Sequence, residues 1–462
     1  MNLDALKSDL AGVALEDNPR IVQQKSRDFY WYSPVLKRQL ENVTADLVAA
    51  PTSEDELLFI LGACFRNNVP VTVRGSGTGN YGQAMPLAGG LVLDLARMNK
   101  VKHIGQGYVV AEPGAILADI DNETRASGQE LRLSPSTYHT ASIGGFVAGG
   151  SGGVGSIRWG GLRDTGNIIR LRIAAMDGSA PSVIDLSGAD LAKASHAYGT
   201  TGVITEVEMP LAPAYDWVDM LVSFPTLRGA ATCAEQLAGA DGLLLKNLSV
   251  VDMWVTPYFR RHAPYVRDGE ALMMVMAAPF AASDVAHMAR RAGGTLTMRS
   301  DQLAEDVRRT LPAAFELGWN HTTLRALRVD PAITYLQSLY PQPSIADKVI
   351  KLAERFGEEM PTHLEFVRFD GAVGCFGLPL VRYTTEERLE EIIRIHEDEG
   401  CPIFNPHRYT LEEGGMKQTD EVQLAFKRRA DPKGLLNPGK MVAWDNPSYD
   451  YGKPYLFPTL SA

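Results

Sequence analysis

Two glycine-rich runs constrain the fold of this chain more than any other feature. The first is Arg74-Gly75-Ser76-Gly77-Thr78-Gly79-Asn80-Tyr81-Gly82, which follows a β-branched strand expected over 69–73. Alternating glycines allow successive backbone N–H groups to turn toward one anionic centre. The run therefore predicts a loop that binds a phosphate or pyrophosphate group, whereas a plain surface turn is the simpler alternative.

Residues 77–82 also fit the pattern GxGxxG, which is typical of dinucleotide-binding Rossmann folds. In those folds the pattern opens a helix and is followed by an acidic residue about 20 positions later. Here Pro86, Gly89 and Gly90 disfavour a helix after the loop, and Asp94 comes too early. We therefore expect the loop to lie outside a Rossmann fold.

The second run, Ser142 to Gly155, interleaves its glycines with Ile143, Phe146, Val147 and Val154. Flexible linkers are polar, so these apolar residues argue against a linker. The pattern indicates backbone that packs tightly around a flat ligand, and it makes the surface-turn interpretation of the first run less favourable.

Length, charge and cysteine spacing exclude several classes of protein. A chain of 462 residues predicts two lobes with a cleft between them. The net charge is -10 and the basic residues are scattered, which argues against a nucleic-acid partner. No apolar run is long enough to span a bilayer and the start lacks a signal pattern, so we expect a cytoplasmic protein. The four cysteines lie too far apart for iron–sulfur ligation.

Hydrophobic periodicity predicts mixed α+β organisation in both lobes. A change of composition near residues 210–214 separates the first lobe from the second, and a helix over 421–430 is expected to pack back on the first lobe. The other main elements are strands over 47–50, 69–73, 91–95, 108–111, 168–175, 202–209 and 272–278, and helices over 57–65, 116–127 and 385–399.

With these two runs and the segment Asp431-Pro432-Lys433-Gly434-Leu435-Leu436-Asn437-Pro438-Gly439-Lys440, the chain resembles a known family. This family is the FAD-linked oxidases and dehydrogenases, which include vanillyl-alcohol oxidase, p-cresol methylhydroxylase, and the D-lactate and glycolate dehydrogenases. The resemblance implies an α+β fold with a two-part FAD-binding domain of the p-cresol methylhydroxylase type over 1–215, whose core is 44–214. An α+β substrate cap over 216–420 and a C-terminal return over 421–462 complete the expected organisation.

The resemblance also implies that the cofactor is FAD and which residues contact it. The implied contacts are Arg74, Gly75, Ser76, Gly77, Thr78, Gly79, Asn80 and Tyr81 at the pyrophosphate; Pro135, Ser136, Thr137, Ser142, Gly144, Gly145, Ala148, Gly152 and Ser156 along the flavin; Gly202, Val203 and Ile204 beside the adenine or diphosphate; and Asn437 and Lys440 from the C-terminal return. Many relatives bond the flavin through a histidine in the first loop, where this chain has Asn80. We therefore expect non-covalent FAD, with His139 as a residue that packs near the flavin or contacts it.

Two polar patches of the second lobe supply candidate catalytic residues, because flavin-dependent oxidation needs a group that takes a proton or stabilises an anion. The candidates are His321 in the first patch and His407, Arg408, Tyr409 and Glu412 in the second. Glu412 matches the glutamate of the Gly-Glu-His-Gly type motif in 2-hydroxy-acid dehydrogenases, but Glu413 replaces its histidine. Whether His321 or His407 is the base stays open.

No metal site is expected. His363 and Glu365 lie on one face of an expected strand, where two such ligands could begin a site, but no third partner is evident. We expect a buried polar pair.

The resulting hypothesis is an FAD-dependent enzyme that oxidises an alcohol, a 2-hydroxy acid or a para-substituted phenol by hydride transfer to the flavin. Oxygen or another acceptor would then take the electrons, and a homodimer is possible. Two alternatives remain: an NAD(P)H-dependent flavin reductase that shares the FAD domain, and a flavin-binding carrier or sensor without turnover.

Overall fold

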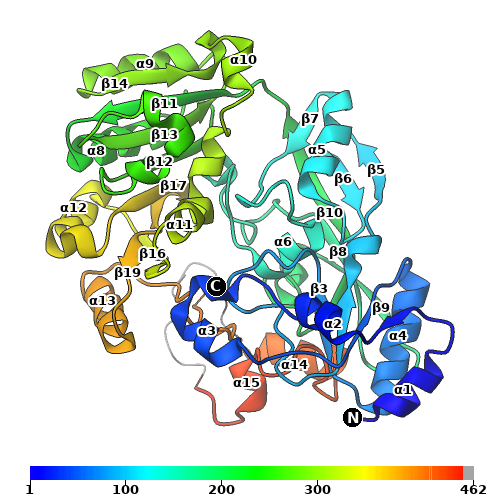
Figure 1. Cartoon of the computed structure of the whole chain (residues 1–462). Coiled ribbons are helices and arrows are strands. Elements are labelled where there is room, and N and C mark those ends of the chain that lie inside the picture. Colours follow the sequence, from blue (N-terminus) through cyan, green and yellow to red (C-terminus); the bar gives the residue numbers. More distant parts are fainter. Residues whose placement is uncertain (416, 418, 451–462) are drawn as a thin grey trace.

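A small sheet with parallel central strands begins the first part of the molecule (Figure 1). The structure is a computed structural model that describes residues 1–415, 417 and 419–450. The sheet has the order β1-β2-β4-β3, with β1 (Leu15–Glu16), β2 (Leu47–Ala49), β4 (Leu91–Asp94) and β3 (Val71–Arg74), of which only β1 is antiparallel to its neighbour.

Helices cover both faces of this sheet, which explains why its strands are continuous apolar runs. Leu57 and Ile60 of α4 (Glu54–Asn67) pack on one face together with α1 (Leu3–Asp9). Val22 of α2 (Pro19–Lys25) packs on the other face. Ser53 caps the start of α4, where its Oγ accepts a hydrogen bond from Glu56 N at 3.2 Å, and the Glu56 carboxylate accepts from Thr52 N at 2.8 Å.

A second sheet, antiparallel throughout, completes the first part. Its order is β5-β6-β10-β8-β9, and β7 pairs with one end of β10. The strands are β5 (Val101–Gly105), β6 (Tyr108–Ala111), β7 (Gln129–Leu131), β8 (Arg170–Ala174), β9 (Val183–Ser187) and β10 (Val203–Pro213), and the helices of this region are α5 (Leu117–Thr124), α6 (Ile143–Gly149) and α7 (Ser156–Trp159).

Helix α6 occupies the second glycine run, where the sequence predicts no helix. Its N-cap is Ser142, whose Oγ accepts a hydrogen bond from Gly145 N at 3.4 Å. Ile143, Phe146 and Val147 recur at helical spacing and are buried in the core of the second sheet. Their burial outweighs the low helix propensity of glycine, which costs about 1 kcal/mol per residue.

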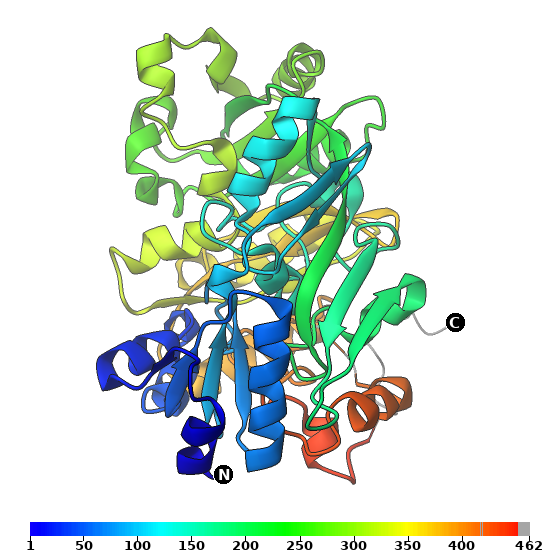
Figure 2. The ribbon, with the colours of Figure 1, turned by 90° about the vertical axis from the view of Figure 1, so that its right-hand side faces the viewer.

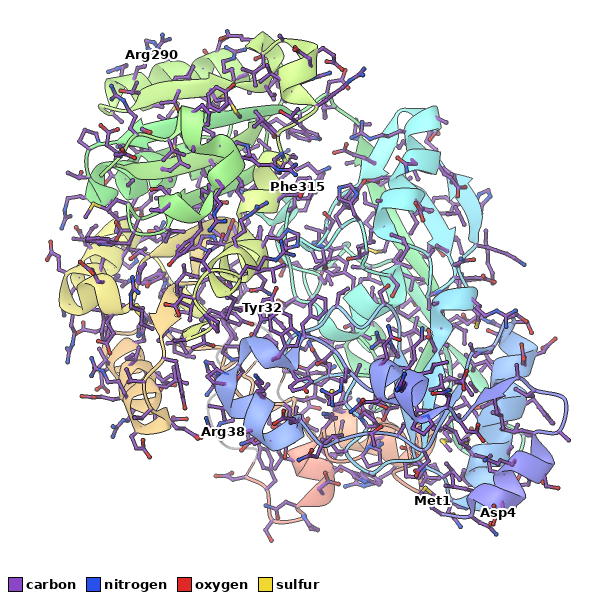
Figure 3. The ribbon with its side chains drawn as sticks, in the orientation of Figure 1. Met1, Asp4, Tyr32, Arg38, Arg290 and Phe315 are labelled. Atoms are coloured by element: carbon purple, nitrogen blue, oxygen red, sulfur yellow. The ribbon has the colours of Figure 1, made fainter. Side chains whose placement is uncertain are left out.

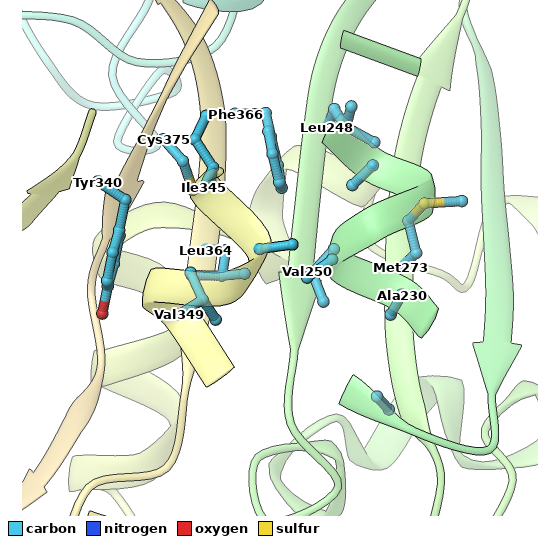
Figure 4. Packing of buried hydrophobic residues seen from close by; sticks show 14 of the residues in the cluster. Ala230, Leu248, Val250, Met273, Tyr340, Ile345, Val349, Leu364, Phe366 and Cys375 are labelled. Carbon is cyan, nitrogen blue, oxygen red and sulfur yellow. The ribbon is translucent and has the colours of Figure 1, made fainter. Parts of the chain in front are cut away.

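The second part of the molecule is built on a seven-stranded antiparallel sheet with the order β14-β11-β13-β12-β17-β18-β16. Side chains of α8 and α12, among them Ala230, Ile345 and Val349, pack against the strands (Figure 4). The elements are β11 (Val218–Phe224), β12 (Leu245–Val251), β13 (Ala271–Ala277), β14 (Thr295–Arg299), β16 (Ser338–Tyr340), β17 (His363–Phe369), β18 (Ala372–Gly377), α8 (Leu227–Ala238), α9 (Ala282–Arg291), α10 (Glu305–Arg308), α11 (Trp319–Leu327), α12 (Ile345–Phe356) and α13 (Glu386–Asp398), with a separate pair of strands, β15 (Ile333–Tyr335) and β19 (Leu380–Arg382).

The chain then returns to the first part, as expected for the helix over 421–430. Helix α14 (Glu421–Ala430) packs into the core of the second sheet through Phe426, and α15 (Val442–Asp445) lies nearby at the base of the molecule (Figure 2). Between them, Leu436 forms a parallel bridge with Val71 of β3. The expected return extends over 421–462, of which 451–462 lie outside the described residues.

Within the described ranges, no helix is long and apolar enough to cross a membrane. Helix α3 (Pro34–Leu40) lies at the junction of the two parts. Tyr32, just before it, lies near the middle of the molecule, whereas Arg290 lies at the outer edge of the second part (Figure 3). The junction is therefore where a ligand could contact both parts.

Candidate active site

A cavity of about 220 Å³ lies at this junction, and its walls come from segments that are far apart in the chain. The second part contributes Trp319, Asn320, His321, Gln337 and Leu378. Most of the predicted cofactor contacts line the cavity from the first part, namely Gly75, Ser76, Gly77, Thr78, Gly79, Asn80, Tyr81, Pro135, Ser136, Thr137, Ser142, Gly144, Gly145, Ala148, Gly152, Gly202 and Ile204.

The first glycine run presents unpaired backbone donors. Among the described residues, no protein acceptor receives a hydrogen bond from the backbone N–H groups of residues 76–80. Gly79 O accepts a hydrogen bond from Phe29 N at 2.7 Å, which holds the loop to the N-terminal segment. A loop of free N–H groups beside the cavity is suited to an anion such as a pyrophosphate.

The two glycine runs approach each other so closely that side chains would not fit. A Cβ atom on Gly75 would lie 2.2 Å from Ser142 Oγ. The second run is also close to the segment that precedes it, since a Cβ atom on Gly153 would lie 2.2 Å from Ser134 O. Glycine is therefore required here by contact distance and not merely by loop flexibility.

The remaining predicted contacts, Arg74, Ser156, Val203, Asn437 and Lys440, do not line the cavity but support the residues that do. The Arg74 guanidinium donates to Arg27 O and to Ser76 O, the latter at 3.2 Å. Ser156 Oγ accepts from Gly153 N at 3.0 Å, and Val203 is a buried residue of β10 between Gly202 and Ile204.

The C-terminal return fixes the first loop from behind. Asn437 Nδ2 donates to Gln83 O at 2.9 Å and to Tyr198 O at 2.8 Å. Lys440 Nζ donates to Gly82 O at 2.6 Å. Burial lowers the pKa of Lys440 to about 7, although the nearby carboxylate of Asp28 favours its charged form.

His196 lines the cavity, and the sequence offered no signal for it. Its Nδ1 lies 2.7 Å from Gly150 O, while Nε2 is buried without a protein partner. Burial lowers the pKa of His196 to about 4, so the imidazole is neutral near pH 7. The unpaired nitrogen is available to a bound ligand. The structure also adds Asp28, Phe29, Tyr32 and Tyr198 to the wall.

The wall from the second part carries the polar side chains that could act on a substrate. Asn320 Oδ1 is buried without a partner, and Gln337 Oε1 accepts from Tyr81 Oη at 3.0 Å. Burial lowers the pKa of His321 to about 4, and the positive charges of Arg325 and Arg328 contribute to this shift. His321 is therefore neutral near pH 7 and can accept a proton.

Comparison with known proteins identifies the domain that contains the two glycine runs. Residues 45–181, which contain both glycine runs, match the family model of an FAD binding domain. The chain is 27% identical over 431 residues to the glycolate oxidase subunit GlcD of Escherichia coli, covering 86% of this chain and 83% of that protein. It is 26% identical over 434 residues to a D-lactate dehydrogenase of Archaeoglobus fulgidus, covering 88% and 93%. The chain therefore contains an FAD binding domain and is similar along most of its length to these two relatives.

Solved structures confirm the predicted fold. The 4-ethylphenol oxidase from Gulosibacter chungangensis has a TM-score of 0.69 at 18% identity, covering 95% of this chain and 96% of that one. An alkyldihydroxyacetonephosphate synthase has a TM-score of 0.71 at 15% identity, covering 95% and 85%. The α+β FAD-binding fold of the p-cresol methylhydroxylase type is therefore present.

The residues of the cavity fit FAD. Its pyrophosphate can bind the free N–H groups of residues 76–80, where the FAD binding domain has its first glycine run. The second glycine run offers a wall without side chains over Gly144, Gly145 and Gly152, against which a flat ring can lie. His196 Nε2 supplies a further polar group to the same cavity.

Four of the five predicted catalytic residues do not line the cavity. His407 is buried, with Nδ1 2.7 Å from Ser33 Oγ and Nε2 3.0 Å from Tyr335 O. Both ring nitrogens are occupied, and burial lowers the pKa of His407 to about 3. This geometry does not support a role for His407 as the base.

The neighbours of His407 also have structural partners. Arg408 forms an ion pair with Glu390 at 2.9 Å. The Tyr409 ring lies 4.9 Å from Lys440 Nζ. The Glu412 carboxylate accepts hydrogen bonds from the backbone N–H groups of Val442 and Ala443 at the start of α15. Of the five candidates, only His321 lines the cavity.

The other residues considered from sequence are also accounted for. His139 is 64% exposed in its side chain and lies 3.9 Å from Glu316. His363 and Glu365 form the expected buried polar pair, with Nε2 and Oε1 2.8 Å apart. All four cysteines are buried, and none lines the cavity within the part of the chain that the structure describes.

Proposed function

We propose that this chain is an FAD-dependent oxidase or dehydrogenase that oxidises a small hydroxy compound, with a 2-hydroxy acid as the favoured substrate class over simple alcohols and para-substituted phenols. One observation carries the proposal: the neutral, half-buried His321 shares a cavity with the glycine runs of the FAD binding domain. Two relatives that match along most of the chain, a glycolate oxidase subunit and a D-lactate dehydrogenase, support the substrate class.

When bound, FAD accepts a hydride from a C–H bond placed over its ring. His321 would take the hydroxyl proton of the substrate, since its imidazole is neutral near pH 7. Asn320 lines the same wall beside His321 and would contact the substrate next to that hydroxyl group. Arg325 and Arg328, whose charges act on His321, provide a positive field that favours a carboxylate substrate.

We further propose that residues 1–215 and 421–462 form the FAD-binding unit, that residues 216–420 form the cap, and that FAD is bound without a covalent link. Asn80 in the first loop and the outward position of His139 support the last point. Precipitation of the protein with acid tests it, because non-covalent FAD is released into the supernatant whereas linked flavin stays with the pellet.

The deciding experiment is anaerobic bleaching of the purified yellow protein. A panel of 2-hydroxy acids, primary alcohols and para-alkylphenols is added singly, and the flavin absorbance near its visible maximum is followed. We expect 2-hydroxy acids to bleach the flavin fastest. Bleaching by NADH or NADPH alone would instead support a flavin reductase, and bleaching by nothing in either set would support a carrier or sensor. A protein without flavin absorbance would overturn the proposal.

A further inference from the structure

A buried hydrogen-bond network in the second part connects its central strands to the wall of the cavity. Glu365 of β17 is 1% exposed, and its Oε1 accepts from Trp319 N at 2.6 Å. The other carboxylate oxygen, Oε2, accepts from Ser249 Oγ at 2.6 Å. The proposed chemistry does not use Glu365, and the cost of burying a carboxylate requires an explanation.

The other partners of Glu365 fix its carboxylate in place beside Trp319. His363 Nε2 lies 2.8 Å from Glu365 Oε1, and His363 Nδ1 is buried without a partner. This arrangement suits the neutral tautomer that carries its proton on Nε2 and donates it to the carboxylate. Asn247 Oδ1 accepts from Trp319 Nε1 at 3.2 Å, and Asn247 Nδ2 donates to Ser249 Oγ at 2.7 Å. The backbone and the indole of Trp319 are therefore both tied to one network.

Trp319 is also where the chain changes direction into the cavity wall. It is the first residue of α11 and has a φ of +50°, in the left-handed region that a bulky residue rarely adopts. The residue before it, Gly318, provides no side-chain cap for the helix. A Cβ atom on Gly318 would lie 2.6 Å from Glu365 Oε1, so glycine permits the close approach of the carboxylate. Glu365, which lies on β17, thus takes the place of the missing side-chain cap.

The consequence reaches the two residues that follow. Asn320 and His321 line the cavity directly after Trp319, so the backbone direction at Trp319 determines where their side chains point. The same strand supports another part of the wall, since His363 O accepts from the backbone N–H of Leu378, a residue that lines the cavity.

We propose that Glu365 is a positioning residue, which holds the start of α11 through Trp319 N–H and thereby sets the directions of Asn320 and His321. Its effect on turnover rests on the proposed function, whereas its effect on α11 does not.

The test compares Glu365→Gln with a matched control, Glu235→Gln, in the FAD-containing protein. Glu235 Oε2 accepts from the backbone N–H of Ala346 at 3.1 Å, at the start of α12, and Glu235 does not line the cavity. Each substitution thus removes the charge from a carboxylate that accepts a hydrogen bond from a backbone N–H at the start of a helix. Only the helix beside Glu365 contributes residues to the cavity wall. Hydrogen exchange is measured in peptides that cover 319–327 and 345–356.

We expect Glu365→Gln to speed exchange in 319–327 by about 10-fold or more, because hydrogen bonds to charged groups are the stronger ones. Exchange in 345–356 should stay within about 2-fold of wild type, and Glu235→Gln should give the reverse pattern. Unchanged exchange in 319–327, or equal acceleration in both segments, would overturn the proposal.

Should Glu365→Gln fail to fold, Ser249→Ala carries the test, since it removes only the donor to Oε2. We expect exchange in 319–327 to rise by about 3-fold, and an unchanged rate there would count against the proposal. With a substrate found by bleaching, Glu365→Gln should lower kcat by about 10-fold or more, because small displacements of catalytic groups are costly. Should wild type oxidise no member of the panel, the proposed function fails while the exchange result still decides the role of Glu365.

Discussion

Replacing Gly75 with alanine tests whether the two glycine runs close on the cofactor together. The new Cβ atom would lie 2.2 Å from Ser142 Oγ, whereas ordinary van der Waals contacts begin near 3.4 Å. Either the backbone of the loop moves by about 1 Å, or the Ser142 hydroxyl rotates away and leaves its N-cap bond to Gly145 N. Both responses disturb residues that line the FAD cavity.

The magnitude follows from these two routes. Loss of an N-cap bond costs about 1 kcal/mol, and overpacking of a tight contact costs about 1 to 3 kcal/mol. If the cost falls on the FAD-bound conformation, the dissociation constant for FAD rises by about 5- to 150-fold. The double variant Gly75→Ala, Ser142→Ala removes the clashing oxygen and should recover part of this loss.

The assay is titration of the apoprotein with FAD, followed by the change in flavin fluorescence. Gly242→Ala is the matched control, because a Cβ atom there meets nothing within 4 Å. The reasoning is refuted if Gly75→Ala binds FAD as tightly as wild type. It is equally refuted if the added Ser142→Ala substitution restores nothing, since the clash would then not be with that hydroxyl.

Three further predictions concern other residues. His321→Gln should lower kcat by about 100-fold or more with FAD affinity unchanged, as measured by steady-state kinetics and FAD titration. Wild type should lose activity as the pH falls through about 4, because His321 is then protonated, and the variant should not show this loss. Asn437→Ala removes hydrogen bonds to Gln83 O and Tyr198 O and should lower the free energy of unfolding by about 2 to 3 kcal/mol in urea titration; an unchanged midpoint would contradict the supporting role. Since the pKa of His407 falls to about 3 on folding, its contribution to stability is full above pH 6.5 and is lost as the pH falls toward 3. The stability difference between pH 7 and pH 4 should therefore be about 3 kcal/mol smaller in His407→Gln than in wild type. Equal differences in the two proteins would refute this.

The cofactor loop could be predicted from sequence because its chemistry is local. Free N–H groups in a glycine run depend on the backbone of consecutive residues, and most of the predicted FAD contacts line the cavity. The failure to predict α6 has the opposite cause. Its helix exists because Ile143, Phe146 and Val147 find a core that other segments build.

Apart from His321, the substrate side could not be predicted, for the same reason. His407 has the residue type of a base, but Ser33, which is 374 positions away, occupies its Nδ1. Tyr32, His196 and Leu378 line the cavity although nothing in their neighbouring sequence marks them. Only packing between distant segments decides which histidine faces a cavity and which one joins two parts of the fold.

The bridge between Leu436 and Val71 has a consequence for the order of events during protein synthesis. The glycine loop emerges from the ribosome early, but Asn437 and Lys440, which support it, are added more than 350 residues later. At typical elongation rates of about 5 to 20 residues per second, the loop waits for tens of seconds without its supports. The loop therefore gains these supports only at the end of synthesis, and until then the nascent chain must keep its exposed sheet edge at β3 from pairing elsewhere.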